Sequence, residues 1–256
     1  MSAFLEYVPG ESPLHRMNPV AKLGAAALFA VACFCTSSLV FLMALLAAGL
    51  ALAAMCGMVR QTLGLVRAVL AFSLILAVVQ LLTTPAGVQL VQLPWGYIGT
   101  GSLLAALTTI VRLAAAAIPL FLVFYVTKTN DLANAAVKVL HVPYKYAFTF
   151  TSTVHFIPVF MNDMKGVMEA QTARGVEFDR GGIVQKARLM VPLCVPLLVS
   201  SVRKTNSAAI AAEVRGFNLR TPASGYKEYP FAALDVTALA AGAALVAAAV
   251  ALGLLG

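Results

Sequence analysis

The chain has 256 residues, of which 61% are hydrophobic and only 11% are charged, and its mean hydropathy is +0.91. This composition excludes an ordinary soluble globular protein and predicts a polytopic membrane protein. The net charge of +8 could suggest nucleic acid as a partner, but 13 of the 18 lysines and arginines lie between residues 128 and 228, together with seven acids. Such a block is typical of the cytoplasmic side of a membrane protein, and no arginine-rich arm accompanies it.

The first half of the chain alternates apolar runs with short polar breaks. Residues 1–19 have none of the features of a cleavable signal peptide, so we expect a cytoplasmic N-terminal segment. Residues 20–127 predict four transmembrane helices. The first covers 20–37, the second 39–59 and the fourth 103–126. Arg60 and Arg67 bracket a predicted turn, and the third helix follows this turn and ends at about residue 82. Residues 83–103 carry no charge and include Trp95, which predicts an outer-face loop with an aromatic anchor.

Residues 128–229 predict a cytoplasmic region of one short and two long amphipathic helices. The short helix covers 132–140, and the long ones cover 144–174 and 183–215, with a turn at Gly181-Gly182 and a bend at Pro158. Residues 230–256 predict a fifth transmembrane helix, apolar except for Asp235. The sequence therefore predicts an all-α fold with about five spans, its N-terminus in the cytoplasm and its C-terminus outside.

Each long helix ends in an Arg-Gly pair. The first pair belongs to Ala173-Arg174-Gly175 and the second to Val214-Arg215-Gly216. A glycine just past the last helical residue fits a left-handed cap, and a cation in the last turn is favourable at the negative end of the helix dipole. We therefore expect both arginines to be presented at helix tips.

The first long helix has an apolar stripe at three-and-four spacing, which fits either a core stripe or an adaptable surface for a partner. Its members are Phe150, Val154, Ile157, Met161, Met164 and Met168. Arg112, inside a predicted span, could pair within the bundle, reach the interface or bind a substrate.

The chain lacks the motifs of a nucleotide-binding loop, a zinc protease and a nucleophile elbow. Its four cysteines lie in apolar runs without metal-site spacing, so we expect them to be packing residues. No catalytic residue, metal or cofactor is therefore predicted for this chain.

Several segments, in order along the chain, resemble the transmembrane T component of energy-coupling factor transporters, the EcfT/CbiQ-like family. They are His15-Arg16-Met17-Asn18-Pro19 with Lys22-Leu23, Ile118-Pro119-Leu120, 127–132, Leu140-His141-Val142-Pro143, Phe156-Ile157-Pro158 and the two Arg-Gly sites. The sequence departs from the family pattern at Val214, where alanine is usual, and at Val20, where arginine is common.

The resemblance implies a non-catalytic subunit of an ABC-type importer in the bacterial cell membrane. The Arg-Gly tips would dock on two cytoplasmic ATPase subunits, which use ATP and magnesium, and a small substrate-binding membrane protein would carry a vitamin or transition metal. The apolar stripe together with Pro158 would contact that protein.

Three other functions compete with this one. A conventional ABC permease fits Glu169-Ala170-Gln171 and Gly175, but Gln185 stands where its motif needs isoleucine, and the second tip has no role there. An integral membrane enzyme needs a convergent acid–base or metal set, and a secondary transporter predicts an inverted repeat.

Overall fold

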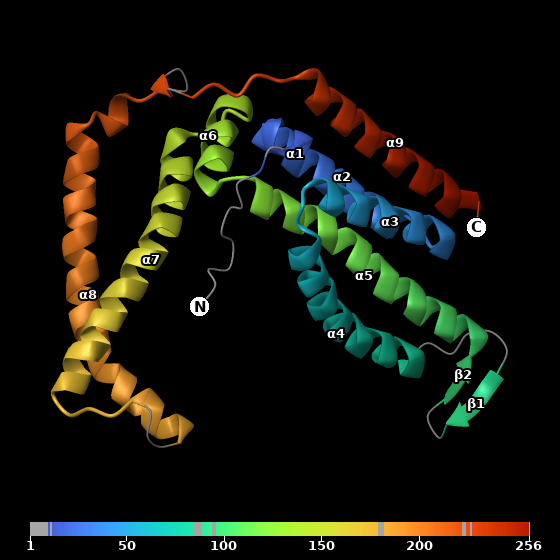
Figure 1. The fold of residues 1–256 in the computed structure, drawn as a ribbon, viewed down its shortest axis with the longest axis horizontal. Coiled ribbons are helices and arrows are strands. Elements are labelled where there is room, and N and C mark those ends of the chain that lie inside the picture. The colour runs from blue at the N-terminus through green and yellow to red at the C-terminus, as the bar shows by residue number, and fades with distance from the viewer. Residues whose placement is uncertain are drawn as a thin grey trace. The chain divides into compact units, whose positions relative to one another are not determined.

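The computed structural model describes residues 10, 12–83, 89–93, 96–178, 182–221, 224–225 and 227–255. The chain folds into two compact units, one formed by Met1–Ala135 with Tyr229–Gly256 and the other by Ala136–Glu228. Helices dominate both units, so the predicted all-α class is confirmed (Figure 1).

The first unit contains six helices and a short hairpin among its described residues. They are α1 (Pro13–Arg16), α2 (Pro19–Cys35), α3 (Leu39–Met55), α4 (Val59–Thr83), β1 (Gln89–Leu93), β2 (Gly96–Gly99), α5 (Thr100–Val126) and α9 (Ala233–Leu255). Helix α6 (Thr129–Val139) begins in this unit and ends in the second, which also holds α7 (Tyr144–Ala173), α8 (Ile183–Val214) and the 3₁₀ turn η1 (Phe217–Leu219).

The apolar helices of the first unit coincide with the predicted spans. Among the described residues, three helices have the length and composition to cross a membrane, at Val59–Thr83, Thr100–Val126 and Ala233–Gly253. Helices α2 and α3 are also apolar but have 17 residues each, at the short end of the roughly 17–25 that cross a bilayer. A polytopic membrane fold is therefore confirmed.

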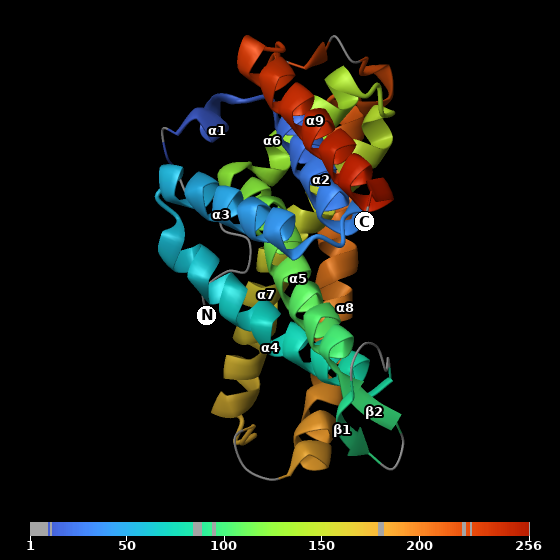
Figure 2. The ribbon, with the colours of Figure 1, turned by 90° about the vertical axis from the view of Figure 1, so that its right-hand side faces the viewer.

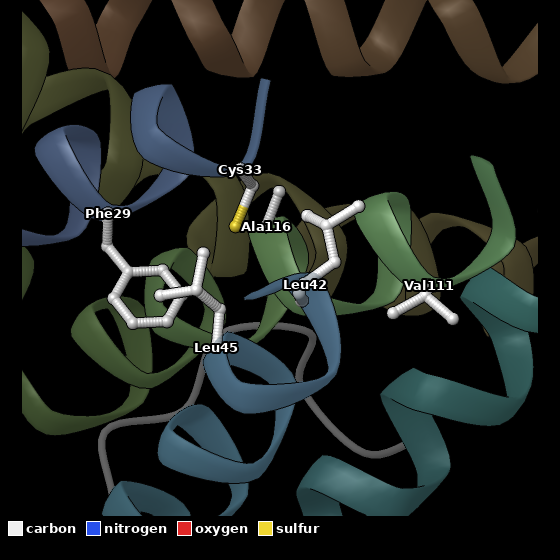
Figure 3. Close-up of a cluster of buried hydrophobic side chains, with 7 residues drawn as sticks. Phe29, Cys33, Leu42, Leu45, Val111 and Ala116 are labelled. Carbon is white, nitrogen blue, oxygen red and sulfur yellow. The ribbon is translucent and has the colours of Figure 1, made fainter. Parts of the chain in front are cut away.

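Helix α5 is the centre of the first unit. It packs against α2, α3 and α4, while α2 also packs against α9 (Figures 1 and 2). A buried cluster joins α2, α3 and α5, where side chains of all three helices point toward one another (Figure 3). Its members are Phe29, Cys33, Leu42, Leu45, Val111, Ala115 and Ala116.

Small residues let α2 and α9 approach closely. A Cβ added at Gly242 would meet the Leu28 side chain at 3.1 Å, and one added at Gly253 would meet the Cys35 carbonyl oxygen at 2.7 Å. Close backbone approach through glycine and alanine is the usual way in which membrane helices gain packing contacts, because lipid gives no hydrophobic drive for association.

Two details of the predicted first half were wrong. Arg60 and Arg67 do not bracket a turn, because α4 runs unbroken from Val59 and the turn lies earlier, at Cys56 and Gly57, where Gly57 has a φ of +70°. The connection from α4 to α5 is also more ordered than a loop, since β1 and β2 pair as an antiparallel hairpin. Trp95, the predicted anchor, lies outside the described residues.

The helices of the predicted coupling region have nearly the bounds that we expected. The short helix is α6, which starts three residues early at Thr129, and the long helices α7 and α8 end at Ala173 and Val214, immediately before the two arginines. Pro158 lies inside α7 as predicted, and the expected bend there stays a prediction.

Candidate functional site

The first Arg-Gly tip is a complete Schellman cap. Arg174 is the C-cap of α7, with φ −88° and ψ 8°, and Gly175 follows in the left-handed region at φ +89°. The Gly175 N–H donates to the Thr172 carbonyl at 2.9 Å, and the Val176 N–H donates to the Gln171 carbonyl at 3.1 Å. Both bonds satisfy carbonyls that the helix end would leave without donors. The exposed Ala173 and Arg174 therefore stand on a well-defined helix end.

The second tip closes differently. Arg215 ends α8, Gly216 has a φ of +71°, and its N–H donates to the Glu213 carbonyl at 2.9 Å. The chain then turns into η1 through a bond from the Leu219 N–H to the Gly216 carbonyl. Arg215 is exposed, and Val214 is 83% exposed. The predicted left-handed glycine cap is thus confirmed at both tips.

An aromatic cluster supports the second tip. Phe217 lies 4.8 Å from Phe148 and 5.6 Å from Tyr144, measured between ring centroids, so η1 packs on the first turns of α7. Arg220 stacks over the Tyr144 ring and donates to its hydroxyl oxygen at 2.6 Å. Aromatic pairs of this kind contribute about 0.5–1.5 kcal/mol each beyond their buried area. The segment that follows α8 therefore packs against the start of α7.

Helices α7 and α8 run in opposite directions and are joined by a polar contact. Lys204 donates to both carboxylate oxygens of Asp163, at 2.6 and 2.5 Å, and the Ser200 hydroxyl donates to the same carboxylate at 2.9 Å. The hydrogen bonds from Lys204 and Ser200 hold the pKa of Asp163 below its usual value. We call this contact of Asp163 with Ser200 and Lys204 the crossing point.

The crossing point is equally far from both tips. Arg174 is eleven positions after Asp163, and Arg215 is eleven positions after Lys204. At 1.5 Å per residue each arm is about 16 Å long, and because the helices are antiparallel the arms extend in opposite directions. The two arginines are therefore roughly 30–35 Å apart at the two ends of one helical pair.

The predicted apolar stripe of α7 lies on a different face from the crossing point. At 100° per residue, Asp163 is about 140° around the helix from the middle of the stripe. Phe150, Ile157 and Met161 are 50%, 57% and 38% exposed. Pro158 is exposed too, whereas Val154, Met164 and Met168 are half-buried. Within the second unit the stripe is a surface rather than a core.

A second stripe on α8 was missed. Val191, Val195, Leu198 and Val202 are each between 51% and 67% exposed and follow a spacing of four, three and four residues. By the same helical periodicity they lie opposite Ser200 and Lys204. The spacing is visible in the sequence, and α8 continues through Pro192 and Pro196 as one helix, as the predicted range of 183–215 requires.

A buried polar network in the first unit was also missed. Asp235 is fully buried and accepts from the Asn18 backbone N–H at 2.9 Å and from the Ala232 N–H at 2.8 Å. The Asn18 side chain caps α2 through the Val20 N–H and donates to the Tyr229 carbonyl at 2.8 Å. One carboxylate thereby joins the starts of α2 and α9.

The network continues to α6. The Tyr229 hydroxyl donates to Asp131 at 3.1 Å, and burial, with Asp131 adding to it, raises the pKa of Tyr229 to about 12. Tyr229 therefore keeps its proton, and its role as donor, at neutral pH. The starts of α2, α6 and α9, which are far apart in the sequence, are held together by these four side chains.

Arg112 has a structural contact in the first unit. Its guanidinium donates to the Thr36 carbonyl at 2.7 Å, and Thr36 is the C-cap of α2. A cation at the negative end of a helix dipole is favourable, so of the roles left open by the sequence, pairing within the bundle is the one observed. Within the described ranges, no three histidines, cysteines or acids lie close enough to hold a metal ion.

Comparison with known proteins relates this arrangement to a family. A family model described as "Cobalt transport protein", CbiQ, matches residues 10–224. The chain is 30% identical over 233 residues to the "Energy-coupling factor transporter transmembrane protein EcfT" of Exiguobacterium sibiricum, which covers 83% of this chain and 84% of that protein. The protein of the same name from Bacillus selenitireducens is 27% identical over 245 residues, covering 92% and 91%.

A third relative extends the likeness over nearly the whole chain. The EcfT protein of Limosilactobacillus fermentum is 29% identical over 251 residues, which is 93% of this chain and 92% of that protein. Both Arg-Gly tips and the helices that carry them lie inside the family match. The chain therefore belongs to the CbiQ family and is a transmembrane component of an energy-coupling factor transporter.

Proposed function

We propose that this chain transmits the motion of two cytoplasmic ATPase subunits to a separate substrate-binding membrane protein. Its main support is the placement of two exposed arginines, Arg174 and Arg215, on capped helix ends at opposite ends of one helical pair. Each ATPase subunit binds one of the two tips. ATP and magnesium act in the ATPases, and this chain performs no catalysis.

The crossing point turns a displacement of the tips into rotation. Asp163 and Lys204 join the helices about 16 Å from either tip, so two ATPases that approach or separate change the angle between α7 and α8. The caps favour transmission over melting, because carbonyls in the last turn of each helix accept backbone N–H bonds. These carbonyls are those of Gln171 and Thr172 on α7 and those of Ala211 and Glu213 on α8.

The substrate-binding protein rests on the apolar surface of the helical pair. Phe150, Ile157 and Met161 supply exposed apolar area on α7, with Val154, Pro158, Met164 and Met168 beside them. Large apolar area that is exposed in an isolated chain marks an interaction surface. A change in crossing angle alters this surface, and the partner reorients to deliver a vitamin or a transition metal.

The placement of the termini follows from the charge. The basic block of residues 128–228 faces the cytoplasm, the N-terminus lies on the same side, and the C-terminus lies outside the cell membrane. A conventional permease has one coupling helix in its cytoplasmic loop, so it leaves one of the two tips without a role.

Co-purification tests the docking. Replacing Arg174 and Arg215 together with alanine should remove the ATPases from the tagged complex and abolish ATP-driven uptake, while the membrane protein partner still co-purifies. Arg203→Ala is the matched control, because Arg203 is also exposed on α8 but lies away from the tip. Full retention of both ATPases by the double variant would refute the proposal.

A distance measurement tests the rotation. Spin labels at Ala173→Cys and Val214→Cys, both exposed positions beside the tips, report the separation of the helix ends in the assembled complex. The native cysteines are first replaced. The separation should change when ATP is added with an ATPase variant that cannot hydrolyse it. An unchanged separation, with ATP bound and uptake intact in the parent complex, would contradict the mechanism.

A further inference from the structure

The first unit contains an apolar cavity of about 430 Å³ that is separate from the tips. Side chains of α2, α3, α5 and α9 line it, and much of the lining is alanine, including Ala25, Ala48 and Ala241. Its volume falls within the range of about 300–1,000 Å³ that ligand cavities occupy. Alanine leaves this space open, where leucine would fill it.

Among the described residues that line the cavity, Lys22 carries the only charge. Lys22 lines it near the start of α2, where its side chain is only 5% exposed and its ammonium donates to the His15 carbonyl at 3.3 Å. Leu14 and Met17 also line the cavity. Among these residues the lining is therefore apolar apart from Lys22, which lies near the start of α2.

Water is a poor occupant of the apolar part. A buried water needs two to four polar partners, and an empty space of this size leaves the lining atoms without dispersion contacts. Ala48 lines the cavity and is exposed, so the cavity is open beside α3, which is an apolar helix.

We propose that the cavity binds one acyl chain of an anionic phospholipid, with the phosphate directed toward Lys22. A methylene chain matches the alanine-rich apolar lining, and a negative headgroup complements the charge of Lys22. The bilayer supplies the ligand without a further partner. This binding site is independent of the coupling role of the tips.

Native mass spectrometry of the delipidated full-length protein tests the site. Phosphatidylglycerol, added in steps, should bind once with a preference over phosphatidylcholine. A cation close to an anionic headgroup contributes about 1 kcal/mol, which corresponds to a preference of about fivefold. Lys22→Gln should remove this preference, and Lys22→Arg should keep it. Equal binding of the two lipids by the unaltered protein would overturn the headgroup assignment.

Substitutions that fill the cavity test whether the acyl chain of the lipid lies in it. Ala48→Trp places a large ring at the rim and should abolish the single bound lipid. Ala54→Trp is the control, because Ala54 is exposed on the same helix but does not line the cavity. Equal lipid binding by both variants would overturn the proposal. So would unchanged lipid binding with loss of the membrane protein partner in Ala48→Trp, because the cavity would then be a protein interface.

Discussion

The two units of the molecule bury their apolar residues very differently. In the first unit, α2, α3 and α5 share a buried cluster, and glycines bring α2 and α9 together. Among the described residues of the second unit, the buried apolar side chains are Val137, Ala147 and Leu193, while stripes on α7 and α8 stay exposed. The first unit is thus defined by contacts within the chain, whereas the helical pair leaves its apolar stripes exposed.

Polar contacts show the same difference. The first unit has a fully buried carboxylate, Asp235, bonded to two backbone N–H groups. The second has a partly exposed ion pair, with Asp163 22% and Lys204 37% exposed. Burial makes the first contact costly to break, and exposure makes the second easy to rearrange. Substitutions at Asp235 in the first unit should therefore reduce the free energy of unfolding more than substitutions at Asp163 in the second unit.

Asp235→Ala should cause the largest loss of stability. It leaves the N–H groups of Asn18 and Ala232 without their acceptor, and each buried unsatisfied group costs about 1–3 kcal/mol. We expect the free energy of unfolding of the first unit to fall by about 2–4 kcal/mol, seen as a lower melting temperature of the purified protein. Asp235→Asn keeps one oxygen acceptor, so its melting temperature should lie between those of the wild type and Asp235→Ala. Melting of Asp235→Ala at the wild-type temperature would show that the network is not stabilising.

Alanine substitutions at Gly175, just after α7, and at Gly166, within α7, should distinguish the effect of the cap from the effect of helix propensity. Gly175→Ala forces an L-residue into the left-handed region, at a cost of about 1–2 kcal/mol. Gly166→Ala is the control, because Gly166 lies within α7 with nothing near its added Cβ and should gain about 0.5–1 kcal/mol. Helicity and ATPase docking measured together should fall in the first variant and hold in the second. Equal docking by both would mean that the cap does not position Arg174.

Phe217→Ala should loosen the second tip alone. It removes the contacts with Tyr144 and Phe148, worth about 1 kcal/mol or slightly more. Spin labels at residues 173 and 214 should then report a broader distribution of distances, and the ATPase at the second tip should bind more weakly. Tyr146→Ala is the control, since Tyr146 is exposed on α7 and belongs neither to the cluster nor to the apolar stripe. Equal broadening in both variants would argue against a specific role of the cluster.

The sequence was most informative for the second unit. The Arg-Gly pairs at residues 174–175 and 215–216 predicted both helix ends, because a left-handed residue after a helix almost requires glycine, which is a local effect. The spacing of Phe150, Ile157 and Met161 likewise placed them on one face. The stripe on α8 is equally local, because its spacing of four, three and four residues is visible in the sequence.

The sequence could not predict which distant groups meet. Asp235 and Asn18 are 217 residues apart, and Arg112 reaches a carbonyl 76 residues away. In an apolar helix every face looks alike, so periodicity does not reveal the partner of a lone polar residue. The start of α4 was misplaced for a similar reason, because arginines near a helix end resemble arginines in a turn.

Asp163→Asn should have the smallest effect on stability and the most informative one on geometry. The pKa of Asp163 is lowered by Lys204 and Ser200, so the carboxylate stabilises the crossing point fully above the ordinary value of about 3.9. That contribution is lost as pH falls through the lower pKa of the folded state. In the isolated chain, the distance distribution between labels at residues 173 and 214 should therefore be narrow at neutral pH and broaden only in strong acid. Asp163→Asn should be broad already at neutral pH and insensitive to acid, whereas Glu169→Gln, an exposed site on the same helix, should behave like the wild type. A narrow, pH-independent distribution in Asp163→Asn would mean that the aromatic cluster alone fixes the angle between α7 and α8, and the second tip would then be the place where that angle is set.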